Sequence, residues 1–333
     1  MPILAGQACR MTCLTGNQEG DSCVAKYILK RLLLMIPIML GVTWLIFSML
    51  YLTPGSPAAY MAGDGATPEA IAELEVQLGL DQPYFVRFFN FLKDLILHGD
   101  LGTSYTTKLP VLQMIRDAYP NTLVLASVSI VFSAFVGISI GIVSAVKQYS
   151  LVDNISMSVL IVLISMPTFW LGLLLILLFS LKLNWLPSSG LDSMAQLILP
   201  TLTISASNLA SIARMTRSSM LEIIRSDYIV TARAKGQREW VVIMHHALRN
   251  ALLPVISTIG LSFGMLLGGS IVTESIFSIS GLGKLLIDAI KARNYPVVQG
   301  GVLCIAIVFC LINLAVDLIY AFVDPRVRSQ YVK

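Results

Sequence analysis

Charged residues are scarce in this sequence. Asp, Glu, Lys and Arg make up 13% of its 333 residues, whereas soluble domains carry roughly 25%. Hydrophobic residues make up 56%, and the mean hydropathy is +0.79. A soluble chain of this composition would expose large apolar patches to water, and a disordered chain has the opposite composition. The shortage of charge excludes both classes and predicts a polytopic protein embedded in a lipid bilayer.

The residue patterns of several other functions are missing too. The net charge is only +4, without a run of Lys and Arg, so no nucleic-acid partner is expected. The pair Cys9 and Cys13 has no second pair of ligands to complete a metal site. His245 and His246 lack a Glu-x-x-His context, and no G-x-x-x-x-G-K-[ST] motif occurs. We therefore expect no catalytic residue, no metal and no cofactor bound by this chain.

Six apolar segments have the length of about 20 residues that a spanning helix needs. None shows the alternation of a membrane barrel. The fold is therefore predicted as an all-α integral membrane protein with six transmembrane helices, and Pro167 is expected to kink the third. The segments cover about 32–52, 122–146, 155–181, 197–215, 252–272 and 297–323.

The distribution of basic residues sets the orientation, because cytoplasmic loops are rich in Lys and Arg. With the N-terminus in the cytoplasm, 15 of the 23 basic residues fall on the inner side. Both termini are therefore predicted to be cytoplasmic. The inner residues are Arg10, Lys26, Lys30, Arg31, Lys147, Arg214, Arg217, Arg225, Arg233, Lys235, Arg238, Arg249, Arg326, Arg328 and Lys333.

The first outer segment, residues 53–121, carries helix signals. Thr67 and Pro68 are typical of a helix start, and Gly79 and Gly99 follow two amphipathic stretches as stop signals. We predict a helical extracytoplasmic cap. A structural role is the more common case for such a cap, and docking of a partner or a position in the headgroup region are the alternatives.

Residues 1–25 differ from the rest, because they have no periodicity and do not form a signal peptide. They are predicted to be an N-terminal extension, either disordered or an artefact of start-site assignment. In the second case translation begins at Val24, which a bacterial GTG start codon can encode. The transmembrane domain is predicted to cover 26–333.

Polar residues in the fourth and fifth spans are candidates for a translocation pathway. Ser205, Asn208 and Ser262 are polar where lipid would penalise them. A serine hydroxyl can bond to a carbonyl of its own helix, and Asn208 is expected to do so less easily. Asp317, in the sixth span, is instead expected to form a structural pair with a hydroxyl or an Arg near the inner face.

Small residues recur at every fourth position in two spans, which predicts close helix packing. The second span carries Ser129, Ser133, Gly137, Gly141 and Ala145, and the fifth carries Gly260, Gly264 and Gly268.

The longest cytoplasmic stretch, residues 218–249, predicts a helix–glycine–helix elbow. One apolar face ends before Gly236, and a second begins after it. The first face contains Leu221, Ile224, Tyr228 and Ala232; the second contains Trp240, Ile243, Ala247 and Ala251.

The elbow resembles the EAA loop of ABC importer permeases, and specifically the B-type subunits of the dipeptide/oligopeptide/nickel family. Val230 stands where the general EAA loop has Glu. Ser56 and Asn294 stand where the family often has Asp. The segments that carry the resemblance are TARAKG at 231–236, HALRNALLP at 246–254, KYILKR at 26–31, GDLGTS at 99–104, GLG at 281–283, NYP at 294–296 and DPR at 324–326.

This resemblance implies a type I importer fold in a bacterial cytoplasmic membrane and a function in peptide import. The implied partners are a second permease in a heterodimer, two cytosolic ATPase subunits that hold ATP-Mg, and an extracytoplasmic binding protein. Import of nickel or another small solute is the alternative, and a stand-alone secondary transporter is the alternative of a different class. The expected contact with the ATPase is formed by Ala232, Ala234, Gly236, His246 and Arg249.

Overall fold

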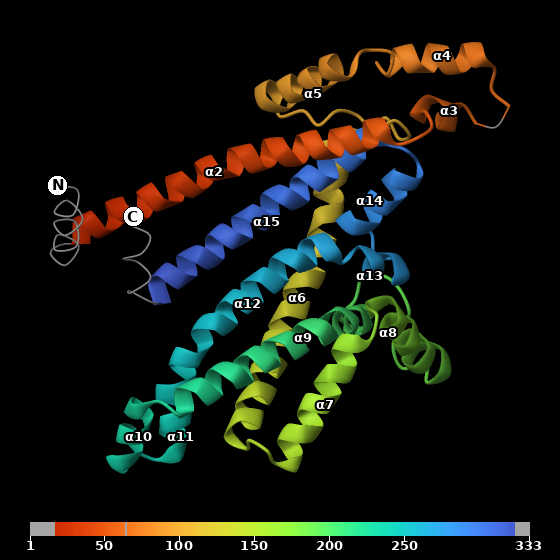
Figure 1. Cartoon of the computed structure of the whole chain (residues 1–333). Coiled ribbons are helices and arrows are strands. Elements are labelled where there is room, and N and C mark those ends of the chain that lie inside the picture. The colour runs from red at the N-terminus through yellow and green to blue at the C-terminus, as the bar shows by residue number, and fades with distance from the viewer. Residues whose placement is uncertain (1–16, 64, 324–333) are drawn as a thin grey trace.

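The structure is a computed structural model, and it describes residues 17–63 and 65–323. Its long elements are all helices, as predicted, and they run obliquely past one another in one bundle (Figure 1). Five helices in the described part are long and apolar enough to span a membrane, and a bent pair makes a sixth. The five are α2 (Asn17–Leu52), α6 (Val111–Val146), α9 (Met194–Ile224), α12 (Leu248–Gly269) and α15 (Tyr295–Val323).

The third predicted span is broken rather than kinked. It consists of α7 (Leu151–Ser165), α8 (Thr168–Leu175) and the π-helix η1 (Ile176–Lys182), with a bend of 103° between α7 and the rest. Pro167 lacks an N–H, and its ring disfavours helical backbone at the preceding residue. Met166 accordingly has an extended ψ of 125°. The proline therefore ends one helix and begins another.

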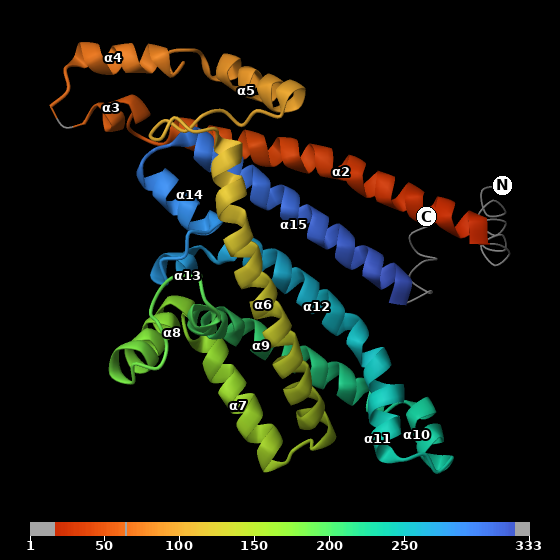
Figure 2. The same cartoon turned by 180° about the vertical axis from the view of Figure 1, so that it is seen from behind.

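The helix with the weakest hydropathy is the central one. Of the 18 consecutive residues of α9 with the highest mean hydropathy, 61% are buried within the protein. The corresponding share is 11% in α2 and in α15. Figure 2 shows α9 crossing α6 between α7 and α12. A helix enclosed by other helices can carry hydroxyl groups that lipid would penalise. The polarity that made this span the weakest prediction therefore reflects its central position.

The small-residue stripes form the predicted tight contacts. A Cβ atom on Gly141 would lie 2.5 Å from Cβ of Thr216 in α9, and one on Gly137 would lie 2.9 Å from the carbonyl of Leu209. In α12, a Cβ atom on Gly260 would collide with Val316 of α15. These glycines let the helix backbones approach closely.

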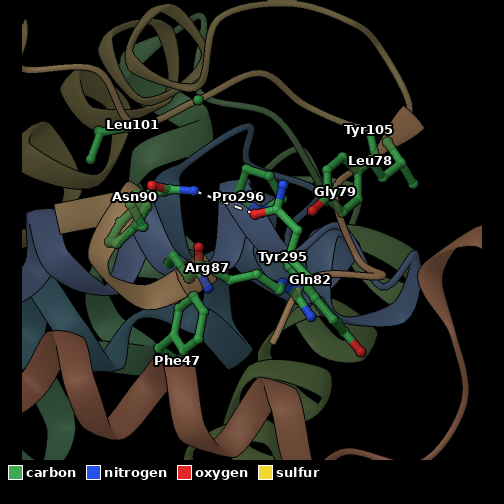
Figure 3. Close-up of a pocket in the computed structure, with 13 residues that line it drawn as sticks. Phe47, Leu78, Gly79, Gln82, Arg87, Asn90, Leu101, Tyr105, Tyr295 and Pro296 are labelled. Atoms are coloured by element: carbon green, nitrogen blue, oxygen red, sulfur yellow. Dashed lines mark hydrogen bonds between the residues drawn. The ribbon is translucent and has the colours of Figure 1, made fainter. Parts of the chain in front are cut away.

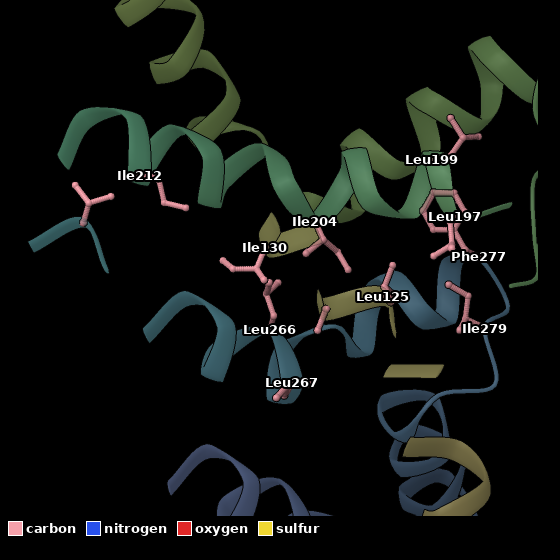
Figure 4. Packing of buried hydrophobic residues seen from close by; sticks show 12 residues of the cluster. Leu125, Ile130, Leu197, Leu199, Ile204, Ile212, Leu266, Leu267, Phe277 and Ile279 are labelled. Carbon is pink, nitrogen blue, oxygen red and sulfur yellow. The ribbon is translucent and has the colours of Figure 1, made fainter. Parts of the chain in front are cut away.

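The main apolar core lies between the helices α6, α9 and α12 and the turn at residues 277–279 (Figure 4). Leu125, Leu199, Ile212 and Phe277 have no exposed surface, and Ile279 keeps 1%. Phe277 closes the core from the end opposite the elbow, directly after the short helix α13 (Ile271–Ile276).

The predicted cap is helical. It contains α3 (Pro57–Ala62), α4 (Pro68–Gln77) and α5 (Tyr84–His98). Thr67 caps α4 as predicted, and Gly79 and Gly99 have the left-handed φ of a helix stop. The predicted outer segment ran to residue 121, but α6 already begins at Val111. Polar residues between 111 and 121 had lowered the apparent hydropathy of a helix that extends beyond the apolar span.

A pair of short helices lies at the same end of the bundle as the cap. It consists of α13 and α14 (Leu282–Lys291) and leads into α15. Most of the predicted N-terminal extension lies outside the described residues, as does the DPR segment at 324–326. The helix α2 begins at Asn17, within the residues that were assigned to the extension.

Candidate functional site

The predicted elbow projects from the end of the bundle opposite the cap (Figures 1 and 2). Its first arm is α10 (Asp227–Ala234); its second is α11 (Glu239–Val241), which continues as the π-helix η2 (Val242–Ala247) into α12. One helix was expected to run through Ile224, but α9 ends there and Ser226 has extended backbone. The Ser226 hydroxyl donates to the carbonyl of Ile223, which helps to end α9.

Gly236 makes the turn between the two arms. Its φ is +76°, a left-handed conformation that glycine adopts without strain, and its N–H donates to the carbonyl of Arg233. A Cβ atom built on Gly236 meets nothing within 4 Å. Backbone conformation, not crowding, is therefore what requires glycine here.

The elbow is held to the bundle through its apolar side. Ile229 and Val242 are fully buried, and they pack with Met220 of α9 and Ala145 of α6. The Asn250 amide also donates to the Tyr228 hydroxyl at 2.9 Å. The elbow is therefore packed against α6 and α9, and its second arm continues directly into α12.

The five predicted contact residues differ in exposure. Ala234, Gly236 and Arg249 are exposed, whereas Ala232 and His246 are half-buried. Ala232 packs against the apolar cluster that seats the elbow.

An ion pair that the sequence analysis did not predict braces the elbow. Arg233 donates to both carboxylate oxygens of Glu239, at 3.2 Å and 2.6 Å. This bond raises the pKa of Arg233 above its ordinary value. The pair joins the two arms across Gly236.

A second unpredicted ion pair lies at the same end of the bundle. Asp153, at the start of α7, is 1% exposed and receives two bonds from Arg217 of α9, at 2.8 Å and 2.7 Å. Arg217 had served only as an orientation marker, and Asp153 fell just before the predicted third span. Neighbours that lie far apart in the sequence give no local signal of such a pair.

A buried carboxylate organises the opposite end. Glu274 of α13 has no exposed surface, and it accepts bonds from Thr122 at 2.8 Å, Ser270 at 2.6 Å and the Lys284 N–H at 3.0 Å. The Thr122 hydroxyl accepts in turn from the Leu282 N–H at 2.8 Å. Within the described residues, no cation pairs with Glu274.

The GLG segment is the cradle of this carboxylate. A Cβ atom on Gly281 would lie 2.4 Å from a Glu274 oxygen, and one on Gly283 would lie 2.6 Å from Ile271 Cα. Glu274 was missed because it lies two residues beyond the predicted fifth span.

Asn294 joins two segments that the sequence analysis had singled out separately. Its side-chain amide donates to Ser104 at 2.8 Å and to Thr106 at 3.1 Å, and its oxygen accepts from the Tyr105 N–H at 3.0 Å. The amide uses donor and acceptor together, which an ionised Asp could not do.

Comparison with known proteins places these features in a family. Residues 137–329 match the family model described as "Binding-protein-dependent transport system inner membrane component", and residues 24–126 match the N-terminal model of such components. The chain belongs to this family. The elbow, the GLG cradle and the Asn294 contacts all lie within the matched residues.

Named relatives resemble the transport component over most of its length. It is 44% identical to the dipeptide transport system permease protein DppB of Alkalihalophilus pseudofirmus, over 91% of this chain and 99% of the relative. It is 45% identical to the glutathione transport system permease protein GsiC of Salmonella choleraesuis, over 91% and 98%. For DppB of Escherichia coli K12 the identity is 42%, over 92% and 99%.

A solved structure supports the fold. The MetNI methionine ABC transporter in an inward-facing conformation superposes with a TM-score of 0.56, covering 64% of this chain and 97% of that chain at 20% identity. The predicted type I importer permease fold is confirmed. The transport component is a multi-pass protein of the inner membrane.

Two predictions about polar residues in the component's spans had different outcomes. Asp317 pairs with Arg31 at 2.9 Å, as expected for a structural pair near the inner face. The premise about Asn208 was wrong, because its amide donates to the carbonyl of Ile204 in its own helix at 3.1 Å. This bond uses one N–H of the amide, and whether Asn208 lines a pathway stays a prediction.

The other candidates for the pathway are buried. Ser205 donates to the carbonyl of Ser129 in α6 at 3.1 Å, and Ser133 donates back to the carbonyl of Ser205. Ser262 in α12 is 9% exposed. In this conformation Ser205 contributes to the contact between α6 and α9, and whether these residues line a pathway stays a prediction.

Proposed function

We propose that this chain is a permease subunit of an ATP-driven importer of short peptides. The full-length relatives are named for dipeptide and glutathione transport, and glutathione is itself a short peptide. At 42–45% identity over at least nine-tenths of the chain, a shared substrate class is the simplest expectation.

The observation that supports a coupling function is that the elbow is packed against the helix bundle on one side and exposed at its tip. It presents the small, exposed residues Ala234 and Gly236 at its tip, while Ile229 and Val242 anchor it to the bundle. Small side chains let a helix end enter a groove of a partner. In our proposal the partner is an ATPase, whose closure on ATP-Mg moves the elbow.

The proposed roles of the contact residues follow from their positions. Ala232, Ala234 and Gly236 form the part that enters the ATPase cleft. His246 and Arg249 lie farther along the second arm, where they bond to the partner or cap carbonyls. The chain itself contributes no ATP chemistry in this scheme.

The proposed assembly contains a second, related permease, two ATPase subunits and an extracytoplasmic binding protein. The elbow and both termini face the cytoplasm, and the cap faces the binding protein. The pathway runs along α9 and α12, with Asn208 and Ser262 as candidate lining residues. Ser205 reaches it only when α6 and α9 separate.

Reconstitution tests this proposal. The chain is expressed together with a candidate partner permease and candidate ATPase subunits, purified in mild detergent and placed in liposomes with a candidate binding protein. We expect ATPase subunits to co-purify and ATP to drive uptake of labelled Ala-Ala. Uptake of a nickel chelate instead would refute the peptide substrate. A chain that purifies without any ATPase, and transports alone, would refute the importer itself.

A further inference from the structure

A pocket of about 230 Å³ lies at the end of the bundle opposite the elbow. Its walls come from α2, from the turn after α4, from α5, from residues 101–105 before α6 and from the first two turns of α15 (Figure 3). Phe47, Phe91 and Leu101 form apolar walls. None of its lining residues is Asp or Glu.

The pocket contains one cation, Arg87 of α5. Its guanidinium lies 5.9 Å from the ring centre of Phe47 and 6.0 Å from that of Tyr51. Aromatic faces attract a cation without neutralising it. No carboxylate in the described part of the chain forms an ion pair with Arg87. The charge is therefore positioned in the pocket without a counter-charge.

Gln299 of α15 is the second observation. The residue is 8% exposed, and it lines the pocket. No described residue forms a hydrogen bond with its amide. Its amide atoms are not among the fully enclosed polar atoms that lack a partner, so they border the open space of the pocket. The amide is thus available to a molecule in the pocket.

Two phenols add further donors. Tyr295 is 7% exposed, Tyr105 is half-buried, and neither hydroxyl has a hydrogen-bond partner among the described residues. Burial raises the pKa of Tyr105, against the opposing effect of the nearby Arg87 charge. Tyr105 therefore keeps its proton. At the rim, the Asn90 amide donates to Gln82 at 3.3 Å.

We propose that this pocket binds the terminal carboxylate of a short peptide. A planar guanidinium matches a carboxylate, and one Arg balances one negative charge. The phenols and the Gln299 amide supply additional donors, and the aromatic walls suit an adjoining apolar side chain. The identity of the ligand rests on the proposed function.

The size of the pocket agrees with this ligand. It is well above the roughly 30 Å³ that one water occupies, and below the roughly 300–1,000 Å³ of sites that enclose drug-sized molecules. It can hold one end of a peptide. The permease thereby recognises the peptide itself, at the end of the bundle remote from the ATPases.

A comparison of two ligands tests the proposal without any mutation. The membrane complex, in phosphatidylcholine nanodiscs and without binding protein, is titrated calorimetrically with Ala-Ala and with Ala-Ala amide. We expect Ala-Ala to bind at least about tenfold more tightly, because only it offers charge-assisted bonds. Equal affinities, or no binding of Ala-Ala, would overturn the proposal.

Variants then locate the site. Arg87→Gln should weaken Ala-Ala binding about tenfold and remove the preference over the amide. Arg87→Lys, which keeps the charge, should retain part of that preference. Lys93→Gln removes an exposed cation from the same helix outside the pocket and should change nothing. Unchanged binding in a folded Arg87→Gln complex would refute the site.

Two further results separate this proposal from neighbouring ones. If glycerol 3-phosphate binds through Arg87 and Ala-Ala does not, the pocket serves a lipid headgroup and the peptide inference is wrong. If the liposomes import Ala-Ala but binding does not depend on Arg87, the pocket proposal fails and the importer stands. Arg87-dependent binding of Ala-Ala without its uptake supports the pocket and refutes peptide import.

Discussion

At the scale of the residue, Gly236 illustrates how one backbone angle shapes the elbow. Glycine adopts its φ of +76° without strain, whereas the same backbone conformation costs a β-branched residue about 1–2 kcal/mol. We expect Gly236→Val to abolish substrate-stimulated ATPase activity in the assembled complex, because the elbow loses its turn. Expression and membrane insertion should stay normal, since a Cβ atom at this position meets no neighbour.

Two other variants control for Gly236→Val. Gly236→Asn should retain most of the stimulation, because Asn tolerates the left-handed conformation. Arg233→Ala should have a smaller effect, because its pair with Glu239 is exposed and such pairs contribute about 0–1 kcal/mol. Normal stimulation in Gly236→Val would exclude the elbow from the coupling mechanism.

Thr122 is the residue that connects Glu274 to α6. Thr122→Val keeps the shape of the side chain but leaves a carboxylate oxygen and the Leu282 N–H each short of one bond. An unsatisfied buried group costs about 1–3 kcal/mol, so thermal unfolding of the purified chain should shift to a clearly lower temperature. Thr122→Ser keeps the hydroxyl and should stay near the wild type. Equal melting of all three would contradict the role assigned to this bond.

Buried charges mark the limit of sequence reasoning about single residues. Asp317 was recognisable because it lies within a hydrophobic run, and a pair with a hydroxyl or an Arg followed from the cost of a charge in lipid. Glu274 and Asp153 lie just beyond the predicted span ends, so they resembled loop residues. Only the return of α13 into the bundle, and the approach of Arg217 from α9, bury them.

At the scale of the element, the glycines of α6 set its distance from α9. Gly141→Ala should destabilise the chain by about 1–3 kcal/mol, because the added methyl group would overlap Thr216. Gly41→Ala in α2 is the matched control, since its Cβ atom would meet nothing within 4 Å. It should be neutral or stabilising by up to about 1 kcal/mol. Unfolding in detergent compares the two, and equal effects would contradict the packing role.

Most elements could be predicted, but their ends and bends were harder. Hydropathy identified all six apolar segments, and turn chemistry located α4 and α5. Hydropathy did not reveal that α6 begins at Val111, because polar residues near Pro120 interrupt the apolar run without interrupting the helix. The 103° bend at Pro167 exceeds an ordinary proline kink, because Met166 also leaves the helical conformation.

At the scale of the whole molecule, the sequence was most informative where several segments agreed. The elbow, the GLG segment and the NYP segment each carried little alone, and together they indicated the family. What they do in space was not predictable. Asn294 links the GDLGTS and NYP segments across about 190 residues of chain, and the pocket beside them draws on five separate segments. Such sites depend on how helices pack, which local patterns do not specify.

The orientation in the membrane is the last prediction. The predicted topology puts 15 of the 23 basic residues, and the elbow, on the cytoplasmic side. Asp81, between α4 and α5, and Lys235, beside Gly236, are both exposed and lie at opposite ends of the bundle. In a chain whose own cysteines are replaced, Asp81→Cys should react with an impermeant maleimide outside the inner membrane. Lys235→Cys should react only after that membrane is permeabilised, because the bilayer otherwise separates it from the reagent. The reverse pattern would invert the topology and place the elbow out of reach of any cytosolic ATPase.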